Sequence, residues 1–283
     1  MLSSSLYLPP SSSSFLSKTL NSQILSPSPR PTPHLYIKFR TSHRENLRYL
    51  KSLGIVNPTA ANPQKPISPD ALAHIIAAVN FLKSKGISDS DFSRLAFFCP
   101  QLFSPTFDTL ELEPNFAFLA NDLRASTEES RGLIVNCPEL LFSNVEYCLK
   151  PTLNYLKKLG VEKLNVPSKL NAHLLNTRVQ KLRGKIKFLK SIGLGYEEAK
   201  RVCRRMPAIF GYSVEENLRP KYEFLTEEME RSLEELKDFP QYFGFSLQKR
   251  IAPRHWHLKK MNKRIKLNRM LMWNDDKFYS KWK

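Results

Sequence analysis

Residues 137–160 read CPELLFSNVEYCLKPTLNYLKKLG, and residues 206–225 read MPAIFGYSVEENLRPKYEFL. In both stretches a proline precedes a short apolar run, and a second proline follows at the same offset. The arrangement occurs four times, at Pro100 and Pro114, Pro138 and Pro151, Pro207 and Pro220, and Pro240 and Pro253. A motif that recurs along the chain with a nearly constant offset between its prolines predicts a stack of repeats.

An amphipathic helix is predicted immediately before each first proline. In YEEAKRVCRRMP the apolar residues recur at i, i+3, i+4 and i+7, which is one face of a helix: Ala199, Val202, Cys203 and Met206. DFSRLAFFCP has the same spacing, through Phe92, Leu95, Ala96 and Cys99. A proline should end each helix, because the residue before proline is driven out of the α region.

The proline-led turn is expected to place apolar side chains in the core. We expect Leu141 and Phe142 of PELLF to be buried at places equivalent to Ile209 and Phe210 of PAIF. The second proline is then expected to open the next helix in its first turn, where a missing N–H does no harm.

One unit departs from the pattern. The interval from Pro138 to Pro207 is about twice that from Pro207 to Pro240, and the stretch after Asn176 (VQKLRGKIKFLKSIG) keeps a helical pattern without either proline. A single helix pair cannot bury its apolar face alone, so neighbouring pairs must stack. The predicted fold class is all-α, a curved α-solenoid in which each unit has two helices and a short proline-led turn.

Residues 1–44 have a different composition from the remainder. They hold twelve Ser, six Pro and five basic residues, and the first acid is Glu45. This composition indicates an organelle transit peptide, chloroplast in preference to mitochondrion, with a plain disordered tail as the alternative. The predicted organisation is a disordered transit peptide over 1–44, repeats over 45–258, and a basic tail with a capping segment over 259–283.

The remainder of the chain offers no signature of catalysis or of metal binding. It has no phosphate-binding glycine loop, dinucleotide-binding motif, HExxH or GxSxG. The four cysteines form no CxxC pair and are expected to be buried small hydrophobes. No apolar run reaches the ~20 residues of a membrane span. We therefore expect no enzyme activity, cofactor, metal or membrane span.

Positive charge is concentrated in two blocks. The full chain carries +18, and residues 169–205 and 249–283 account for +9 and +10, whereas 86–168 and 206–248 are net acidic. Basic clusters on successive helices predict phosphate contacts, and a solvated helix face is the alternative. In the first block the candidate nucleic-acid-binding residues are Arg178, Lys181, Arg183, Lys185, Lys187, Lys200, Arg201, Arg204 and Arg205.

The second block adds candidates at the end of the repeats: Lys249, Arg250, Arg254, Lys259 and Lys260. Embedded among them are His255, Trp256 and His257. The two histidines are separated by one residue and do not share a helix face, so a metal site is not expected. Trp256 is expected in the capping core, and a base-stacking role is the alternative.

The double-proline unit, with its helix ending in PxLL or PxLF and its next helix ending in FLKxLG, resembles the mTERF family, the mitochondrial transcription termination factors and their plant organelle relatives. The resemblance runs from about Tyr49 to Pro253 and extends to the closing stretches GFSLQKRIAPRHWHL and NDDKFYSKW. It implies a helical solenoid that binds RNA or double-stranded DNA without catalysis or a cofactor. The roles it implies are organelle transcription termination, transcript processing, intron splicing or ribosomal RNA maturation.

On this basis we expect a monomer in the chloroplast, with the mitochondrion as the alternative, and RNA or DNA as the ligand. Organelle splicing or transcription proteins are further expected partners. The alternative function is a protein-binding α-solenoid scaffold in an organelle complex. Salt dependence of binding separates the two, because neutralising several phosphates makes affinity fall steeply with added salt.

Overall fold

The structure is a computed structural model that describes residues 42–55 and 67–283, all within one structural unit. The transit peptide expected over 1–44 lies outside these residues except for 42–44, where Ser42 caps the first helix. The described residues contain helices and no strand. None of these helices has the length and apolar character needed to cross a membrane.

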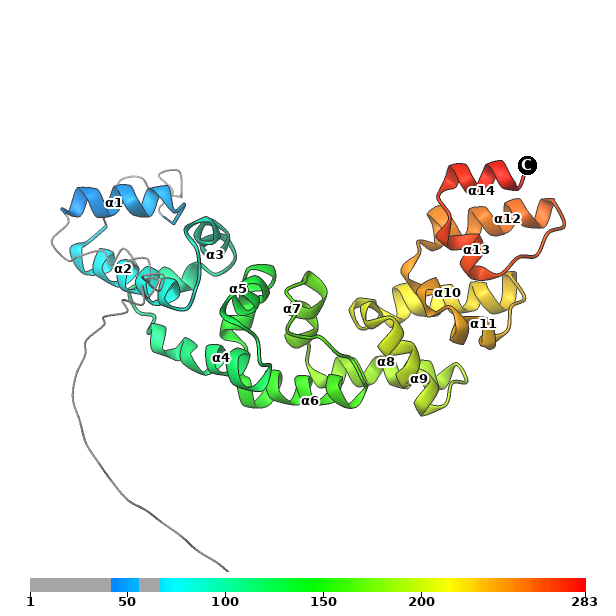
Figure 1. The fold of residues 1–283 in the computed structure, drawn as a ribbon, viewed down its shortest axis with the longest axis horizontal. Helices are drawn as coiled ribbons and strands as arrows, with labels where there is room; N and C mark the ends of the chain where they lie inside the picture. The colour runs from blue at the N-terminus through cyan, green and yellow to red at the C-terminus, as the bar shows by residue number, and fades with distance from the viewer. Residues whose placement is uncertain (1–41, 56–66) are drawn as a thin grey trace, which may run out of the picture. The chain divides into compact units, whose positions relative to one another are not determined.

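The α-helices follow one another along the chain as labelled in Figure 1: α1 (His43–Ser52), α2 (Pro69–Ser84), α3 (Phe92–Phe98), α4 (Glu113–Ala117), α5 (Thr127–Asn136), α6 (Lys150–Lys158), α7 (Lys169–Leu175), α8 (Val179–Ser191), α9 (Tyr196–Arg205), α10 (Arg219–Glu223), α11 (Leu233–Asp238), α12 (Ala252–Lys260), α13 (Leu267–Met272) and α14 (Asp275–Lys281). Helices of successive units pack together, and α5 and α7 lie side by side (Figure 1). The all-α repeat fold is confirmed.

The helix before each first proline ends as predicted. Residues Cys99, Cys137, Met206 and Phe239 each precede a proline, and their φ lies between −133° and −146° with ψ between 61° and 82°, outside the α region. Their helices bury the predicted apolar faces, and Ala199, Val202 and Cys203 of α9 are at most 2% exposed.

A 3₁₀ turn follows each of these prolines: η2 (Pro100–Phe103), η5 (Pro138–Phe142), η7 (Pro207–Gly211) and η10 (Pro240–Gly244). The second and third residues after the proline are buried in all four turns: Leu102 and Phe103, Leu140 and Leu141, Ile209 and Phe210, Tyr242 and Phe243. The prediction was right for Leu141, Ile209 and Phe210, and wrong for Phe142, which is 37% exposed. Phe142 is the fourth residue after its proline, so the expected equivalence was one residue out of register.

The second proline lies in the first turn of an α-helix in all four units, as predicted, because it is the second residue of α4, α6, α10 and α12. In three units a π-helical turn precedes this α-helix: η6 (Val145–Leu149), η8 (Val214–Leu218) or η11 (Leu247–Ile251), with the caps Asn144, Ser213 and Ser246. Each proline comes seven residues after its cap. The wider π turn, with bonds such as Leu149 N–H to Asn144 O, accommodates a proline that would otherwise clash with a helical carbonyl.

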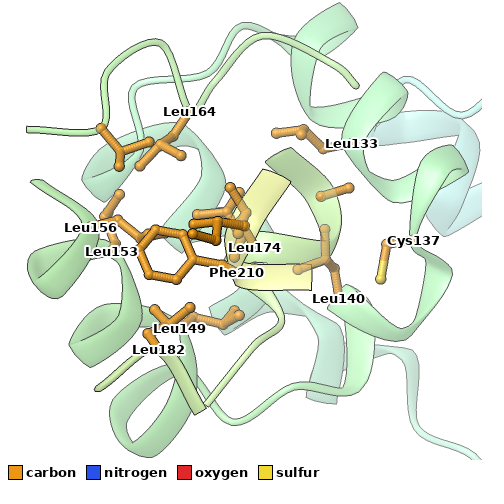
Figure 2. Close-up of a cluster of buried hydrophobic side chains, with 14 of the residues drawn as sticks. Leu133, Cys137, Leu140, Leu149, Leu153, Leu156, Leu164, Leu174, Leu182 and Phe210 are labelled. Carbon is orange, nitrogen blue, oxygen red and sulfur yellow. The ribbon is translucent and has the colours of Figure 1, made fainter. Parts of the chain in front are cut away.

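The unit around Asn176 lacks the proline-led turn altogether. Between the helix end and the next cap three of the other units have seven residue steps, from Cys137 to Asn144 for example, and the first unit has nine. Here Asn176 leads to the cap Arg178 in two. Phe210 of the following turn takes up core space at this point, where it lies among leucines of α6, α7 and α8 (Figure 2). The departure seen in the sequence is therefore a five-residue shortening of the connection.

A buried polar side chain follows each second proline and bonds to the next unit. Asn115 donates to Leu140 O and Ser143 O at 2.7 Å, and Thr152 donates to Thr177 O at 2.7 Å. Their equivalents Lys221 and Arg254 donate to Phe243 O at 2.7 Å and to Met270 O at 2.6 Å. All four donors are at most 6% exposed. They bond to main-chain carbonyls in the turns or, for Met270, in the last turn of α13, and we call them the inter-unit donors.

Candidate nucleic-acid interface

The first cationic surface is built on α8 and α9, which pack against each other. Helix α8 turns Leu182, Ile186 and Leu189 into the core, so the basic residues between them emerge on both flanks. Its exposed cations are Arg178, Lys181, Arg183, Lys187 and Lys190, and Lys185 is half-buried. On α9 the exposed arginines are Arg201, Arg204 and Arg205, and Lys200 is half-buried. We call these cations the central cationic surface.

Most of the central cationic surface has no acidic partner. Within the described residues, ion pairs to this surface are limited to Lys200, which lies 3.2 Å from Glu197. Arg183 lies over the Tyr155 ring of α6 at 5.7 Å. Arg178, Lys181, Lys187, Arg201 and Arg204 make no hydrogen bond or ion pair through their side chains in the described part of the chain. Unpaired cations that neighbour one another are suited to phosphate binding.

Two cations of the central cationic surface, Arg205 and Lys185, interact with other parts of the protein. Arg205 donates to Lys237 O at 2.9 Å and to Asp238 O at 2.7 Å, which are carbonyls at the end of α11 in the next unit. Burial, and then the nearby ammonium of Lys181, lower the pKa of Lys185. Arg205 therefore has a structural role. Lys185 is held close to the positive charge of Lys181, and a bound anion would reduce the repulsion between them.

The second cluster divides into surface and core. Lys249, Lys259 and Lys260 are exposed, and Arg250 is half-buried, donating to Trp273 O at 3.1 Å. Arg254 is 1% exposed and its guanidinium donates to Met270 O and, at 2.5 Å, to Asp275. The expectation that Arg254 contacts nucleic acid is wrong, because it is the last inter-unit donor and fixes the C-terminal helices.

Trp256 fits neither of its two expected roles completely. It is 40% exposed, its ring meets Phe224 edge-on at 6.2 Å, and Lys259 Nζ lies 4.9 Å above it. His257 bonds to Trp282 O in the final helix. In the described residues no group of three His, Cys, Asp or Glu side chains is arranged to hold a metal.

The cysteines behave as small hydrophobes. Cys99, Cys137 and Cys203 are buried, Cys148 is half-buried, and all four are free thiols. Burial raises the pKa of Cys203 to about 12 and that of Cys99 to about 11. Both thiols are therefore protonated at neutral pH and unreactive as nucleophiles.

Sequence reasoning missed a hollow beside the central cationic surface. It is lined by Phe142, Ser143, Asn144, Tyr147, Cys148, Asn176, Arg178 and Gln180. Tyr147 is 88% exposed. It stands three residues after its helix cap, where the other units have Glu216 and Lys249. A tyrosine in a place that is otherwise charged was the available signal.

Comparison with known proteins places this architecture. The family model described as mTERF matches residues 111–279. The chain is also 30% identical over 98 residues to a protein of Arabidopsis thaliana, "Transcription termination factor MTERF2, chloroplastic". That alignment covers 35% of this chain and 15% of the relative's length. Since the family model spans more than half of the chain and coincides with the double-proline units, the protein belongs to the mTERF family.

Proposed function

We propose that this protein binds RNA or DNA in a plant organelle without catalysing a reaction, and that it acts by occupying or reshaping its ligand. The observation that carries the proposal is the central cationic surface, where eight of the ten cations have no side-chain hydrogen bond or ion pair in the described residues. A face that served only solubility would interleave both signs of charge.

Plastid gene expression is the proposed setting. The name of the Arabidopsis relative places that protein in the chloroplast as a transcription termination factor. Here the Ser-rich, acid-free residues 1–44 support the same compartment, with transcription termination, transcript processing, intron splicing or ribosomal RNA maturation as the process. Fused to a fluorescent reporter, these residues should direct it to chloroplasts. Mitochondrial or cytosolic fluorescence would contradict the proposed location.

Salt-dependent binding tests the nucleic-acid role. Replacing Lys187, Arg201 and Arg204 by Gln removes three exposed cations that the fold does not use, and it spares Arg205 with its bonds to α11. The slope of log affinity against log salt should flatten by about two units for a single strand and nearer three for a duplex, at ~0.7 and ~0.9 per contact.

A matched control removes the same charge elsewhere. Lys51, Arg124 and Lys163 are exposed and lie outside both cationic blocks. The Gln variant of these three should keep the wild-type slope within about half a unit, because nonspecific net charge contributes little compared with direct phosphate contacts. Equal slopes in both triple variants would refute the assignment of the central cationic surface.

A protein-binding scaffold remains the second candidate, and one observation favours it. Phe97 and Phe98 at the end of α3 are 79% and 44% exposed. They occupy the same place before their proline as Arg204 and Arg205 of α9 do before theirs. Exposed aromatic residues at this position are suited to a protein contact. A Phe97→Ser, Phe98→Ser variant that loses a protein partner but keeps nucleic-acid affinity would support this role.

A further inference from the structure

A hollow lies between two units beside the shortened connection after α7. Its far wall is formed by Asn176, Arg178 and Gln180, from the connection and the start of α8, and its near wall by η5 and η6. In the other units a proline-led turn stands between the helix end and the next cap. Here that turn is missing, and the open space measures about 700 Å³. This size accommodates a small planar ligand.

Several side chains around the hollow have groups that are free to bind a ligand. Tyr147 is 88% exposed and contributes no packing, although its backbone N–H is capped by Asn144 Oδ1. That bond leaves the Asn144 amide group free to donate. Gln180 is exposed and, within the described residues, makes no hydrogen bond through its side chain. An aromatic face, two amides and a guanidinium thus surround one space.

This combination of groups recognises an unpaired base. Aromatic rings stack on bases of any sequence, and Asn or Gln amides match the donor and acceptor edges of bases. Arg178 follows at the start of α8, and Lys181 and Lys185 continue along the same flank. Bases in a duplex present their faces to one another, so they would have to leave the stack before entering such a hollow.

We propose that the hollow binds one unpaired nucleotide of a single-stranded nucleic acid, with its base on Tyr147 and its edge at Gln180 and Asn144. The backbone then continues over Arg178 towards Lys181 and Lys185. This inference rests on the proposed function and adds a preference to it: single strands or unpaired loops bind better than continuous duplex.

The test compares three labelled probes by fluorescence anisotropy: a mixed-sequence single-stranded RNA of about 20 nucleotides, the DNA strand of the same sequence, and the blunt DNA duplex. Tyr147→Ala should weaken binding of a single strand about tenfold, and Tyr147→Phe should restore it, because stacking needs the ring and not the hydroxyl. Duplex affinity and the salt slope should change little, since no phosphate contact is lost. The RNA and DNA arms show which strand is preferred.

Tyr279→Ala is the matched control, because Tyr279 is also exposed (38%) but lies on α14, away from the hollow. A second readout is photocrosslinking of a 5-bromouridine-substituted strand, which should map to Tyr147 or its neighbours. If Tyr147→Ala binds single strands as wild type does, or loses single-strand and duplex affinity equally, the inference is overturned. If the Lys187, Arg201 and Arg204 variant still flattens the salt slope, only the inference about the hollow is rejected and the proposed function stands. If neither the Tyr147 variant weakens single-strand binding nor the triple variant flattens the slope, the inference and the proposed function are both rejected.

Discussion

The ammonium group of Lys221 lies 2.7 Å from the main-chain oxygen of Phe243, one unit further along the stack, in a place where it is 5% exposed. Lys221 also donates to Asn217 Oδ1 at 2.7 Å, and no carboxylate pairs with it in the described residues. A cation buried with neutral partners alone costs solvation free energy. Burial accordingly lowers the pKa of Lys221 below its ordinary value of 10.5.

The first prediction follows from this lowered pKa. Between the folded pKa and 10.5 the unfolded chain binds more protons at Lys221 than the folded one, so stability rises with pH in that window. The free energy of unfolding of wild type, measured relative to Lys221→Met by urea denaturation, should therefore increase from pH 7 to pH 10. A difference between wild type and Lys221→Met that falls with pH would contradict the burial of a charged amine.

The second prediction compares two phenylalanines that sequence reasoning treated alike. Phe210 is 4% exposed in the core (Figure 2), whereas Phe142 is 37% exposed and meets Phe107 at 5.6 Å. Phe210→Ala should cost ~3 to 5 kcal/mol of unfolding free energy. Phe142→Ala should cost less than about half of that, because much of its ring is already in water. Equal losses of unfolding free energy in chemical denaturation would show instead that Phe142 and Phe210 occupy equivalent core positions.

The third prediction concerns Arg254. Its replacement by Met should destabilise the protein by about 1 to 3 kcal/mol, because Met270 O loses its donor and Asp275 its partner. The salt slope of nucleic-acid binding should stay at the wild-type value, unlike that of the triple variant on α8 and α9. Thermal unfolding and anisotropy titrations measure the two quantities. A flattened salt slope with unchanged stability would show that Arg254 contacts nucleic acid and does not stabilise the fold.

The fourth prediction uses two glycines. Gly184 lies in α8, where an added Cβ meets nothing within 4 Å, so Gly184→Ala should stabilise the protein by ~0.5 to 1 kcal/mol through helix propensity. Gly86 has φ +92°, and its Cβ would lie 2.4 Å from Thr127 Cγ2. Gly86→Ala should therefore destabilise the stack in the same denaturation assay. A higher unfolding free energy for Gly86→Ala would contradict the close approach of Gly86, after α2, to Thr127 of α5.

Periodic features of this fold could be predicted and register-dependent ones could not. The helix faces through Ala199, Val202 and Cys203 follow from apolar spacing alone, and the stop before each proline follows from local sterics. The π turns before the second prolines could not be foreseen, because a proline at that position is equally compatible with a helix start.

The candidate site shows the same division. The clustering of charge on α8 and α9 was readable as composition, but a sequence does not tell which arginine is buried. Arg254 stands among exposed lysines in the chain, and only its position after Pro253 reveals the series it shares with Asn115 and Thr152. The hollow at Tyr147 is lined by residues of two units that are far apart in the sequence, so the apolar and charge patterns of a single helix do not reveal it.

The inter-unit donors also bear on whether these units can be exchanged. Asn115, Thr152, Lys221 and Arg254 differ in length, charge and number of N–H or O–H groups. Asn115 and Thr152 both reach the carbonyl just before the next cap, whereas Lys221 and Arg254 reach carbonyls at other places in their neighbours. Similar helices are thus connected to the next unit by different side-chain hydrogen bonds. A shuffled or consensus version of this protein would have to transplant each donor together with the turn that receives it, so the evolutionary and engineering module is the junction between two units and not the unit itself.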